Sequence, residues 1–288
     1  MISPKQQASA AAIPWRYPRV LSIAGSDSGG GAGIQADLKT CSALGCFGMT
    51  AITAITAQNT CGVSGIHAIP AAMLASQIDA VASDIGIDAV KIGMLHDPAV
   101  VDVVAQAIRR YRWPHVVLDP VMVATSGDRL IAEETLDVLV RELFPLASVV
   151  TPNLDEVALL LGRPVQDEDQ FEGAARELLQ RGAQAVLLKG GHLPGVDVVD
   201  LLVQSDASPL RLSSARIDSR NTHGTGCTLS SALACYLALG QPLAEAVRAA
   251  RAYILQAIAQ GADVQTGHGH GPLNHFHTPL PMRKLPLR

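Results

Sequence analysis

Short runs of β-branched and other apolar residues alternate along this chain with longer stretches of helical periodicity. The runs that we predict as buried strands cover residues 20–24, 50–56, 88–92, 115–118, 148–151 and 185–189. The predicted helices cover residues 32–44, 73–85, 98–111, 133–143, 154–161, 168–181, 228–239 and 243–262. Strands that alternate with helices predict an α/β fold with a mostly parallel, doubly wound sheet and right-handed crossovers. Residues 197–203 and 210–213 predict a hairpin near one edge of that sheet.

The chain shows no internal repeat and no linker that would divide it, so we expect residues 18–288 to form a single domain. Residues 1–17 are expected to be a flexible N-terminal extension, because they lack the basic start and apolar centre of a signal peptide. The tail from Thr266 is rich in Gly, His and Pro and is expected to be irregular. The spacing of its histidines matches no zinc site, and we expect them to line a site or a subunit contact; they are His268, His270, His275 and His277.

The composition of the chain limits the kinds of molecule that we expect it to bind. The formal net charge of −4 disfavours nucleic acid and acidic membrane surfaces as partners. No apolar run approaches the roughly 20 residues of a membrane-spanning helix. The five cysteines are scattered and include no CxxC pair, which disfavours a disulfide framework or a structural zinc site. We therefore expect a cytoplasmic protein that acts on small molecules.

Polar or glycine-rich residues follow each of the six predicted parallel strands. In open α/β sheets, ligands bind outside the carboxyl ends of the strands. We therefore expect these six exits to build one ligand site; they are residues 25–31, 58–59, 93–94, 119–120, 152–153 and 189–192.

The segment 220–228, Arg-Asn-Thr-His-Gly-Thr-Gly-Cys-Thr, joins a polar loop to a predicted helix. Its two glycines allow backbone N–H groups to turn toward one point, and the helix adds its positive end, so the segment predicts an anion site. Cys227 lies in the first helical turn, where amide dipoles favour a thiolate over a thiol. The pattern suggests phosphoryl transfer with Cys227 as the base. The alternative is a tight turn in which Cys227 is a small apolar residue of the core.

Residues 31–36, Gly-Ala-Gly-Ile-Gln-Ala, match the loose dinucleotide pattern GxGxxA. A nicotinamide site should show an acidic residue about 20 positions further on, but no Asp or Glu stands between Asp37 and Asp79. An NAD-dependent oxidoreductase is therefore a remote alternative, and the glycines are expected to allow close packing between strand and helix. Asp37 itself is placed to interact with the dipole of that helix.

Thr151 to Glu156 join a predicted strand to a predicted helix. Asn153 and Glu156 have the spacing of a capping box. Alternatively, Glu156 and Asp119 bind Mg²⁺ beside a triphosphate. Lys189 either neutralises phosphate charge or is a solvated ammonium at a strand end. Gln58 offers paired donor and acceptor groups that suit the edge of a heterocycle.

Taken together, these segments resemble the hydroxymethylpyrimidine/phosphomethylpyrimidine kinase family of thiamine biosynthesis, within the ribokinase-like superfamily. The resemblance runs from about Val20 to His277 and rests on eight segments in order: IAGSDSGGGAGIQADLKT, AITAQNT, KIGML, LDPVMVATSGD, TPNLDE, LKGGH, NTHGTGC and GPLNHFH. It implies a three-layer α/β/α domain, usually a homodimer. It also implies two successive transfers of the ATP γ-phosphate, first to 4-amino-5-hydroxymethyl-2-methylpyrimidine and then to its monophosphate.

The resemblance also implies roles for individual residues. Cys227 would be the catalytic base, and the amides of Gly224, Thr225 and Gly226 would form the anion hole. The pyrimidine pocket would be lined by Gly25, Asp37, Gln58, Met94 and Val121. ATP and Mg²⁺ would lie among Asp119, Asn153, Glu156 and Lys189, with Asp119 and Glu156 nearest the metal.

A cysteine-type pyridoxal kinase is the nearest alternative within the same superfamily, because pyridoxal also carries a hydroxymethyl group on a six-membered nitrogen ring. Such kinases tend to carry a second cysteine in the segment that follows the Asp-Pro-Val-Met string. Here residues 123–128 read Val-Ala-Thr-Ser-Gly-Asp, without cysteine. This difference favours the thiamine enzyme.

Overall fold

One sheet runs through the part of the chain that this computed structural model describes, residues 15–122, 131 and 133–287. Its nine strands lie in the order β10-β9-β8-β7-β6-β5-β2-β3-β4, and the six from β8 to β3 are parallel. The strands are β2 (Arg19–Asp27), β3 (Phe47–Asn59), β4 (Gly62–Ala68), β5 (Ala89–Ile92), β6 (Val116–Leu118), β7 (Val149–Val150), β8 (Ala185–Lys189), β9 (Asp197–Gln204) and β10 (Ala207–Ala215).

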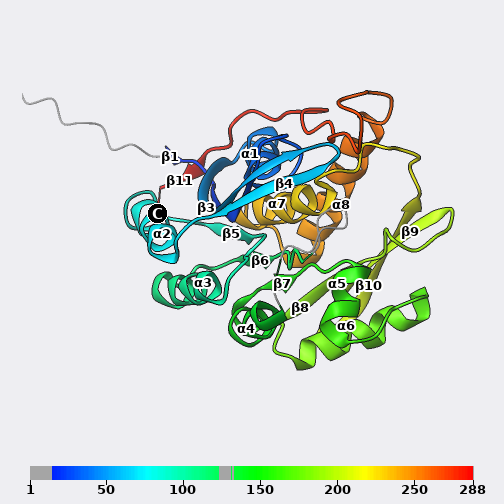
Figure 1. The fold of residues 1–288 in the computed structure, drawn as a ribbon, viewed down its shortest axis with the longest axis horizontal. Coiled ribbons are helices and arrows are strands. Elements are labelled where there is room, and N and C mark those ends of the chain that lie inside the picture. The colour runs from blue at the N-terminus through cyan, green and yellow to red at the C-terminus, as the bar shows by residue number, and fades with distance from the viewer. Residues whose placement is uncertain (1–14, 123–130, 132, 288) are drawn as a thin grey trace, which may run out of the picture.

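Helices cover both faces of this sheet and give three layers (Figure 1). One face carries α1 (Gly33–Ala43), α7 (Thr225–Ala238) and α8 (Leu243–Ala259). The other carries α2 (Ala71–Asp84), α3 (Pro98–Tyr111), α4 (Glu133–Leu143), α5 (Leu154–Leu161) and α6 (Phe171–Gln180), with the short 3₁₀ helices η1 (Phe144–Leu146) and η2 (Glu168–Gln170). The predicted α/β/α architecture with a mostly parallel sheet is confirmed.

The central strand β6 is apolar on both faces because it serves two separate cores. Val116 and Leu118 point into the core under α2 to α6, whereas Val117 between them points into the core under α1, α7 and α8. Alternate residues of a strand face opposite sides of the sheet, so a continuous apolar run is what a sheet covered on both sides requires. This is why the parallel strands could be located in the sequence.

The helices begin and end at residues with ordinary capping chemistry. Asp97 caps α3 by accepting a hydrogen bond from the N–H of Ala99 at 2.7 Å, and Pro98 occupies the first turn. Asn153 and Glu156 form the predicted capping box at the start of α5. α7 begins at Thr225, three residues earlier than the predicted helix, so Cys227 does lie in its first turn.

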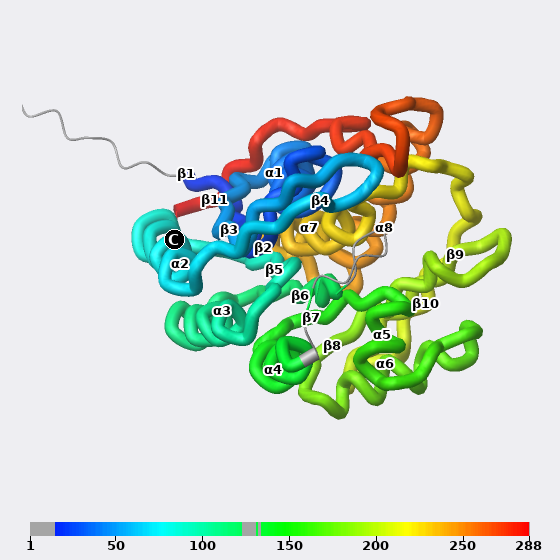
Figure 2. Tube along the Cα trace, viewed as in Figure 1, coloured from blue at the N-terminus to red at the C-terminus, as the bar shows by residue number. Residues whose placement is uncertain are grey.

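Three strands were not predicted. β4 pairs antiparallel with β3 at one sheet edge, and β1 (Trp15–Arg16) pairs with β11 (Leu285–Pro286) in a small separate sheet. Figure 2 shows this pair, in which the two ends of the described chain lie side by side. Trp15 to Tyr17 are therefore part of the folded structure, which corrects the expected extension of residues 1–17. Residues 1–14 of that extension lie outside the described residues, as does the segment 123–128.

The hairpin β9–β10 forms the opposite sheet edge, as predicted. All five cysteines are free thiols. Within the described ranges, no helix is long and apolar enough to cross a membrane.

Candidate active site

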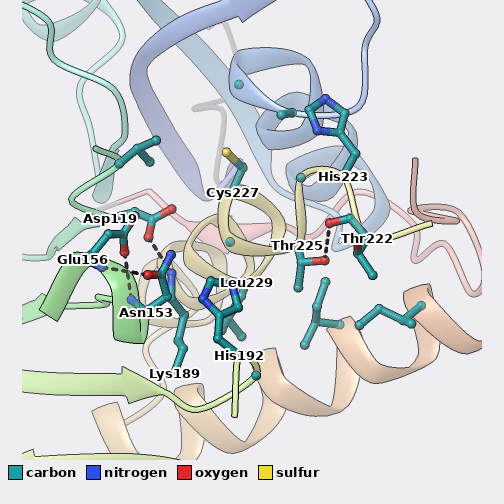
Figure 3. A pocket seen from close by; sticks show the side chains of 18 of the residues that line it. Asp119, Asn153, Glu156, Lys189, His192, Thr222, His223, Thr225, Cys227 and Leu229 are labelled. Carbon is teal, nitrogen blue, oxygen red and sulfur yellow. Dashed lines mark hydrogen bonds and ion pairs between the residues drawn. The ribbon is translucent and has the colours of Figure 1, made fainter. Parts of the chain in front are cut away.

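A cavity of about 730 Å³ opens at the carboxyl ends of the parallel strands. All six strand exits named above contribute to its wall, so they meet at one cavity as predicted. Twelve of the thirteen predicted site residues line it, namely Gly25, Gln58, Met94, Asp119, Val121, Asn153, Glu156, Lys189, Gly224, Thr225, Gly226 and Cys227. Figure 3 shows Asp119, Asn153, Glu156 and Lys189 gathered on one side, with Cys227 projecting from the start of α7.

Asp37 is the exception: it was expected to line the pyrimidine pocket, but it does not line this cavity. Its side chain is fully buried beneath the cavity floor, between α1 and the sheet. Both carboxylate oxygens accept hydrogen bonds from the ammonium of Lys91, at 3.0 and 2.9 Å. Ser22 and Ser231 donate to the same carboxylate. A carboxylate with these partners is satisfied inside the protein, so it needs no ligand.

The glycine loop before α7 is held in a conformation that a side chain would prevent. Gly224 caps the helix with φ +84°, and a Cβ there would lie 1.9 Å from the carbonyl oxygen of Gly31. The hydroxyl and the N–H of Thr225 both donate to the carbonyl of Thr222, at 2.7 and 3.2 Å. The loop therefore brings the backbone of 224–226 close to the strand-to-helix turn before α1. The loop lines the cavity together with the start of α7, and the N-terminus of a helix favours an anion.

The glycines of the GxGxxA pattern have the packing role that was the alternative to nucleotide binding. A Cβ on Gly33 would lie 2.3 Å from the carbonyl oxygen of Gly25, and φ at Gly33 is +55°. A Cβ on Gly31 would lie 2.3 Å from the ring of His223. Only glycine allows these close approaches, so the pattern is explained by contact between the two loops.

Asp27 and His223 join those two loops; both lie in segments predicted to belong to the site, but neither side chain was given a role. The carboxylate of Asp27 accepts hydrogen bonds from the N–H groups of Gly29, Gly31 and Ala32 at 2.7 to 3.0 Å. His223 Nε2 lies 2.9 Å from the same carboxylate. Burial opposes ionisation of Asp27, but His223 and the backbone donors outweigh it and lower the pKa of the carboxyl. The pair fixes the glycine loop against the turn before α1.

The ionisation expected for Cys227 is reversed. Removal of the thiol from water raises its pKa to about 11. Lys91 and the N–H of Gly33 favour the thiolate, but Asp37 and Asp119 oppose it. The position at a helix N-terminus was identified correctly, whereas the cost of desolvation was not visible in the sequence. In the free protein the thiol form therefore predominates at neutral pH.

Asp119 and Lys189 form a buried ion pair at the exits of β6 and β8. Lys189 Nζ lies 2.9 Å from Asp119 Oδ1, which also accepts from the hydroxyl of Thr151. Burial works to raise the pKa of Asp119, but Lys189 and Lys91 lower it below its ordinary value. The carboxylate is therefore ionised and held rigidly at the cavity wall.

Glu156 lines the same wall and has a second function in the fold. Its carboxylate accepts from the N–H of Asn153 at 2.8 Å and so completes the capping box of α5. Burial raises the pKa of Glu156 to about 7; Lys189 opposes this shift and Asp119 adds to it. Both interpretations made from the sequence, a cap and a carboxylate at the site, apply to this residue.

Comparison with known proteins agrees with this geometry. The family model described as phosphomethylpyrimidine kinase matches residues 27–274. A hydroxymethylpyrimidine/phosphomethylpyrimidine kinase of Rhizobium meliloti strain 1021 is 52% identical over 258 residues, covering 89% of this chain and 96% of the relative.

Two solved structures superpose on most of the chain. The phosphomethylpyrimidine kinase of Clostridium difficile 630 has a TM-score of 0.73 and 43% identity, covering 83% of this chain and 99% of that one. An ADP complex of Bacillus subtilis pyridoxal kinase has a TM-score of 0.84 and 36% identity, covering 90% and 98%. On this evidence the chain belongs to the phosphomethylpyrimidine kinase family.

Proposed function

We propose that this protein transfers the γ-phosphate of ATP to the hydroxymethyl group of 4-amino-5-hydroxymethyl-2-methylpyrimidine and then to the resulting monophosphate, giving the diphosphate used to make thiamine. The observation that carries the proposal is the single cavity that joins Cys227, the 224–226 loop and the Asp119–Lys189 pair. Family membership supports the same activity.

The part of the cavity near the exits of β2, β3 and β5 suits a small planar heterocycle. A Cβ on Gly25 would lie 2.8 Å from Cε of Met94. The absence of a side chain at Gly25 therefore leaves room for the Met94 thioether beside the position that we assign to the pyrimidine ring. Gln58 is oriented by the hydroxyl of Thr56, which lies 3.1 Å from its amide oxygen. The amide retains donor and acceptor capacity, which matches the amino group and ring nitrogen of an aminopyrimidine. Gly25, Gln58, Met94 and Val121 are the residues we assign to this substrate.

The opposite part of the cavity suits a nucleotide. Its wall is largely apolar and includes Val198, Ala215, Ile217, Leu229, Ile254, Leu255 and Ile258, as a buried purine ring requires. Lys189, Asp119 and Asn153 line the same cavity as this wall and the 224–226 loop. A nucleotide with its base on the apolar wall would place its phosphates beside Lys189 and the start of α7.

The carboxylates present fit Mg²⁺ bound through phosphate. Magnesium prefers oxygen ligands, keeps several waters and commonly binds one or two carboxylates together with substrate phosphates. Asp119 and Glu156 supply two such carboxylates at the cavity wall. Within the described residues, no group of three or more His, Cys, Asp or Glu side chains could hold a metal by itself. Bound there with ATP, the ion would neutralise charge on the phosphates.

The chemistry follows from what the chain places around the acceptor alcohol. In the first transfer the thiolate of Cys227 accepts the hydroxyl proton as the alcohol oxygen bonds to the γ-phosphorus and the bond to the departing ADP breaks. The backbone of 224–226 and the ammonium of Lys189 stabilise the charge on the moving phosphoryl group. In the second transfer the nucleophile is a phosphate oxygen that is already anionic, so it needs no base.

The deciding experiment is ADP release in the presence of ATP, Mg²⁺ and either the pyrimidine or pyridoxal, with product masses recorded. Two mass increments of phosphate on the pyrimidine are expected. Turnover of pyridoxal alone would overturn the assignment and favour the pyridoxal kinase alternative, to which the likeness to the Bacillus subtilis enzyme points.

We also propose that the protein is a cytoplasmic homodimer. Three large apolar side chains are exposed on the edge strand β4 and on its neighbours β3 and α2. They are Ile66, Ile55 and Met73, and at least 50% of the surface of each residue is accessible to solvent. An edge strand with an apolar surface is suited to pair with a second copy. Light scattering of the purified protein should give twice the chain mass, and Ile66→Asp should shift it toward the monomer. A monomer at all concentrations would contradict the proposal.

The carboxyl of Glu156 should make nucleotide binding depend on pH. Since its pKa in the folded protein is about 7, the carboxyl is mostly protonated at pH 6 and mostly ionised at pH 8. We expect ATP–Mg²⁺ to bind about fivefold to tenfold more weakly at pH 6 than at pH 8, because a protonated carboxyl is a poor ligand. Calorimetric titration at the two pH values measures this. Glu156→Gln keeps the capping oxygen and should bind equally at both values; an unchanged pH dependence would assign the effect to another group.

A further inference from the structure

Lys91 is a buried cation that the mechanism above does not use. It is fully buried in the central strand β5, among apolar neighbours on both sides in the chain. Along β5 the side chain of Ala89 belongs to the core under α1 and α7, and those of Val90 and Ile92 to the opposite core. Because residues two apart in a strand face the same side, Lys91 extends toward α1 and α7. Buried lysines are rare unless paired.

The ammonium of Lys91 lies at the exit of the strand, where the cavity begins. A Cβ on Gly93 would lie only 2.9 Å from Lys91 Nζ, so the absence of a side chain at residue 93 makes room for the charge. Lys91 belongs to the wall of the cavity together with Cys227. Among the described residues its hydrogen bonds go to Asp37, through two contacts to the carboxylate oxygens, while an ammonium has three donors.

Asp37 connects this ammonium to the helix that carries Cys227. The hydroxyl of Ser231 donates to Asp37 at 2.7 Å. Ser231 lies four residues after Cys227 on α7, so both side chains are on one face of the helix. The carboxylate thus holds Lys91 on one side and α7 on the other.

We infer that Lys91 is a positioning residue for the phosphoryl transfer: its ammonium, held by Asp37, is the counter-charge that allows the buried Cys227 to form a thiolate. The inference rests on the proposed role of Cys227 as a base. The other charged groups around the thiol are Asp37 on α1, Asp119 after β6 and Lys189 at the end of β8. The two carboxylates disfavour the thiolate, so the cations Lys91 and Lys189 must offset them. Lys189 is already paired with Asp119, and the proposed function assigns it to the phosphates of ATP.

The test measures the thiol directly and does not require turnover. The rate of alkylation of Cys227 by iodoacetamide is followed by peptide mass spectrometry between pH 6 and 10, because only the thiolate reacts. In Lys91→Met we expect the rate at pH 8 to fall about tenfold or more, corresponding to a shift of one pH unit or more in the profile. The exposed Cys61 is the internal control in the same samples, and its rate of alkylation should not change.

Two further variants distinguish an electrostatic role from a structural one. Asp37→Asn removes the negative partner and should make Cys227 react faster, the opposite direction to Lys91→Met. Loss of reactivity in both variants would show that the pair only holds α7 in place and would overturn the inference. Should Lys91→Met fail to fold because Asp37 is left unpaired, the double variant Lys91→Met/Asp37→Asn leaves no unpaired charge. It should still react more slowly than the wild-type protein, because the thiol then lacks the cation that the inference assigns to it.

A charge-loss control lies at the other end of the same sheet. Arg19 begins β2 and pairs with Asp88 at 3.0 Å, far from the cavity. Arg19→Gln should leave the alkylation profile of Cys227 unchanged. An unchanged profile in Lys91→Met as well would overturn the inference. Because kinase assays on the pyrimidine and on pyridoxal are run separately, failure of the proposed substrate is distinguished from failure of the role of Lys91.

Discussion

Replacing Cys227 with alanine is expected to slow the first phosphorylation by about 10²- to 10⁴-fold, the usual contribution of general-base catalysis, and the second by much less. The acceptor in the first step is an alcohol, which is a poor nucleophile until its proton is removed. The acceptor in the second is an anionic phosphate. Single-turnover assays of each step, with the pyrimidine and with its monophosphate, give the two rates separately.

The matched control for this variant is Cys235→Ala on the same helix. Cys235 is fully buried, with its sulfur 3.5 Å from that of Cys41, and lies in the core away from the cavity wall. Its loss should cost about 1 kcal/mol of stability through lost packing and leave the ratio of the two rates unchanged. Equal slowing of both steps by Cys227→Ala would contradict the role of Cys227 as a base for the alcohol.

Gly224→Ala is expected to have the second largest effect. The new Cβ would lie 1.9 Å from the carbonyl oxygen of Gly31 and 3.2 Å from Cα of Ala32, and both are backbone atoms that cannot rotate away. The residue also has φ +84°, which costs an L-residue about 1 kcal/mol. Either the loop moves or the turn before α1 does. We expect a loss of about 3 kcal/mol in unfolding free energy and at least about 100-fold in kcat, because a misplaced anion site stabilises the phosphoryl group poorly.

Gly240→Ala is the control that distinguishes the cost of a positive φ from the cost of a steric clash of the added Cβ. Gly240 follows the same helix α7 and has φ +86°, but apart from its immediate chain neighbours no heavy atom of the described residues lies within 4 Å of the Cβ that alanine would add. The Gly240→Ala variant should lose only about 1 kcal/mol of unfolding free energy, measured by urea denaturation, and keep its activity. If the two variants lost the same stability and activity, contact between the glycine loop and Gly31 would not be what orders the site.

Most of the fold could be predicted because local patterns and tertiary structure agree. The parallel strands are mostly apolar because both faces of the sheet are covered, and α3, α4 and α5 begin and end at the predicted residues. β4 was missed because five of its seven residues are exposed and it carries no apolar run. β1 and β11 were missed because two-residue strands have no periodicity, and their pairing joins opposite ends of the chain.

The candidate site also has a part that the sequence predicts and a part that it does not. The positions at the strand exits were predictable, because topology brings the carboxyl ends of parallel strands to one edge. The partners within the site were not. Asp37 was expected in the pocket but is covered by Lys91, which lies 54 residues further along the chain. Asp27 and His223 meet across a separation of 196 residues, and nothing in either local segment marks that contact.

Cys227 shows what the sequence by itself determined and what only the tertiary structure decided. The sequence determined that a thiol stands in the first turn of a helix, after a glycine loop and at the mouth of a doubly wound sheet, because these follow from local pattern and chain order. Only the tertiary structure decided the ionisation of that thiol. The pKa of a group depends on the water removed from it and on the charges that distant elements bring near it, and here those charges come from β5, α1 and the exit of β6.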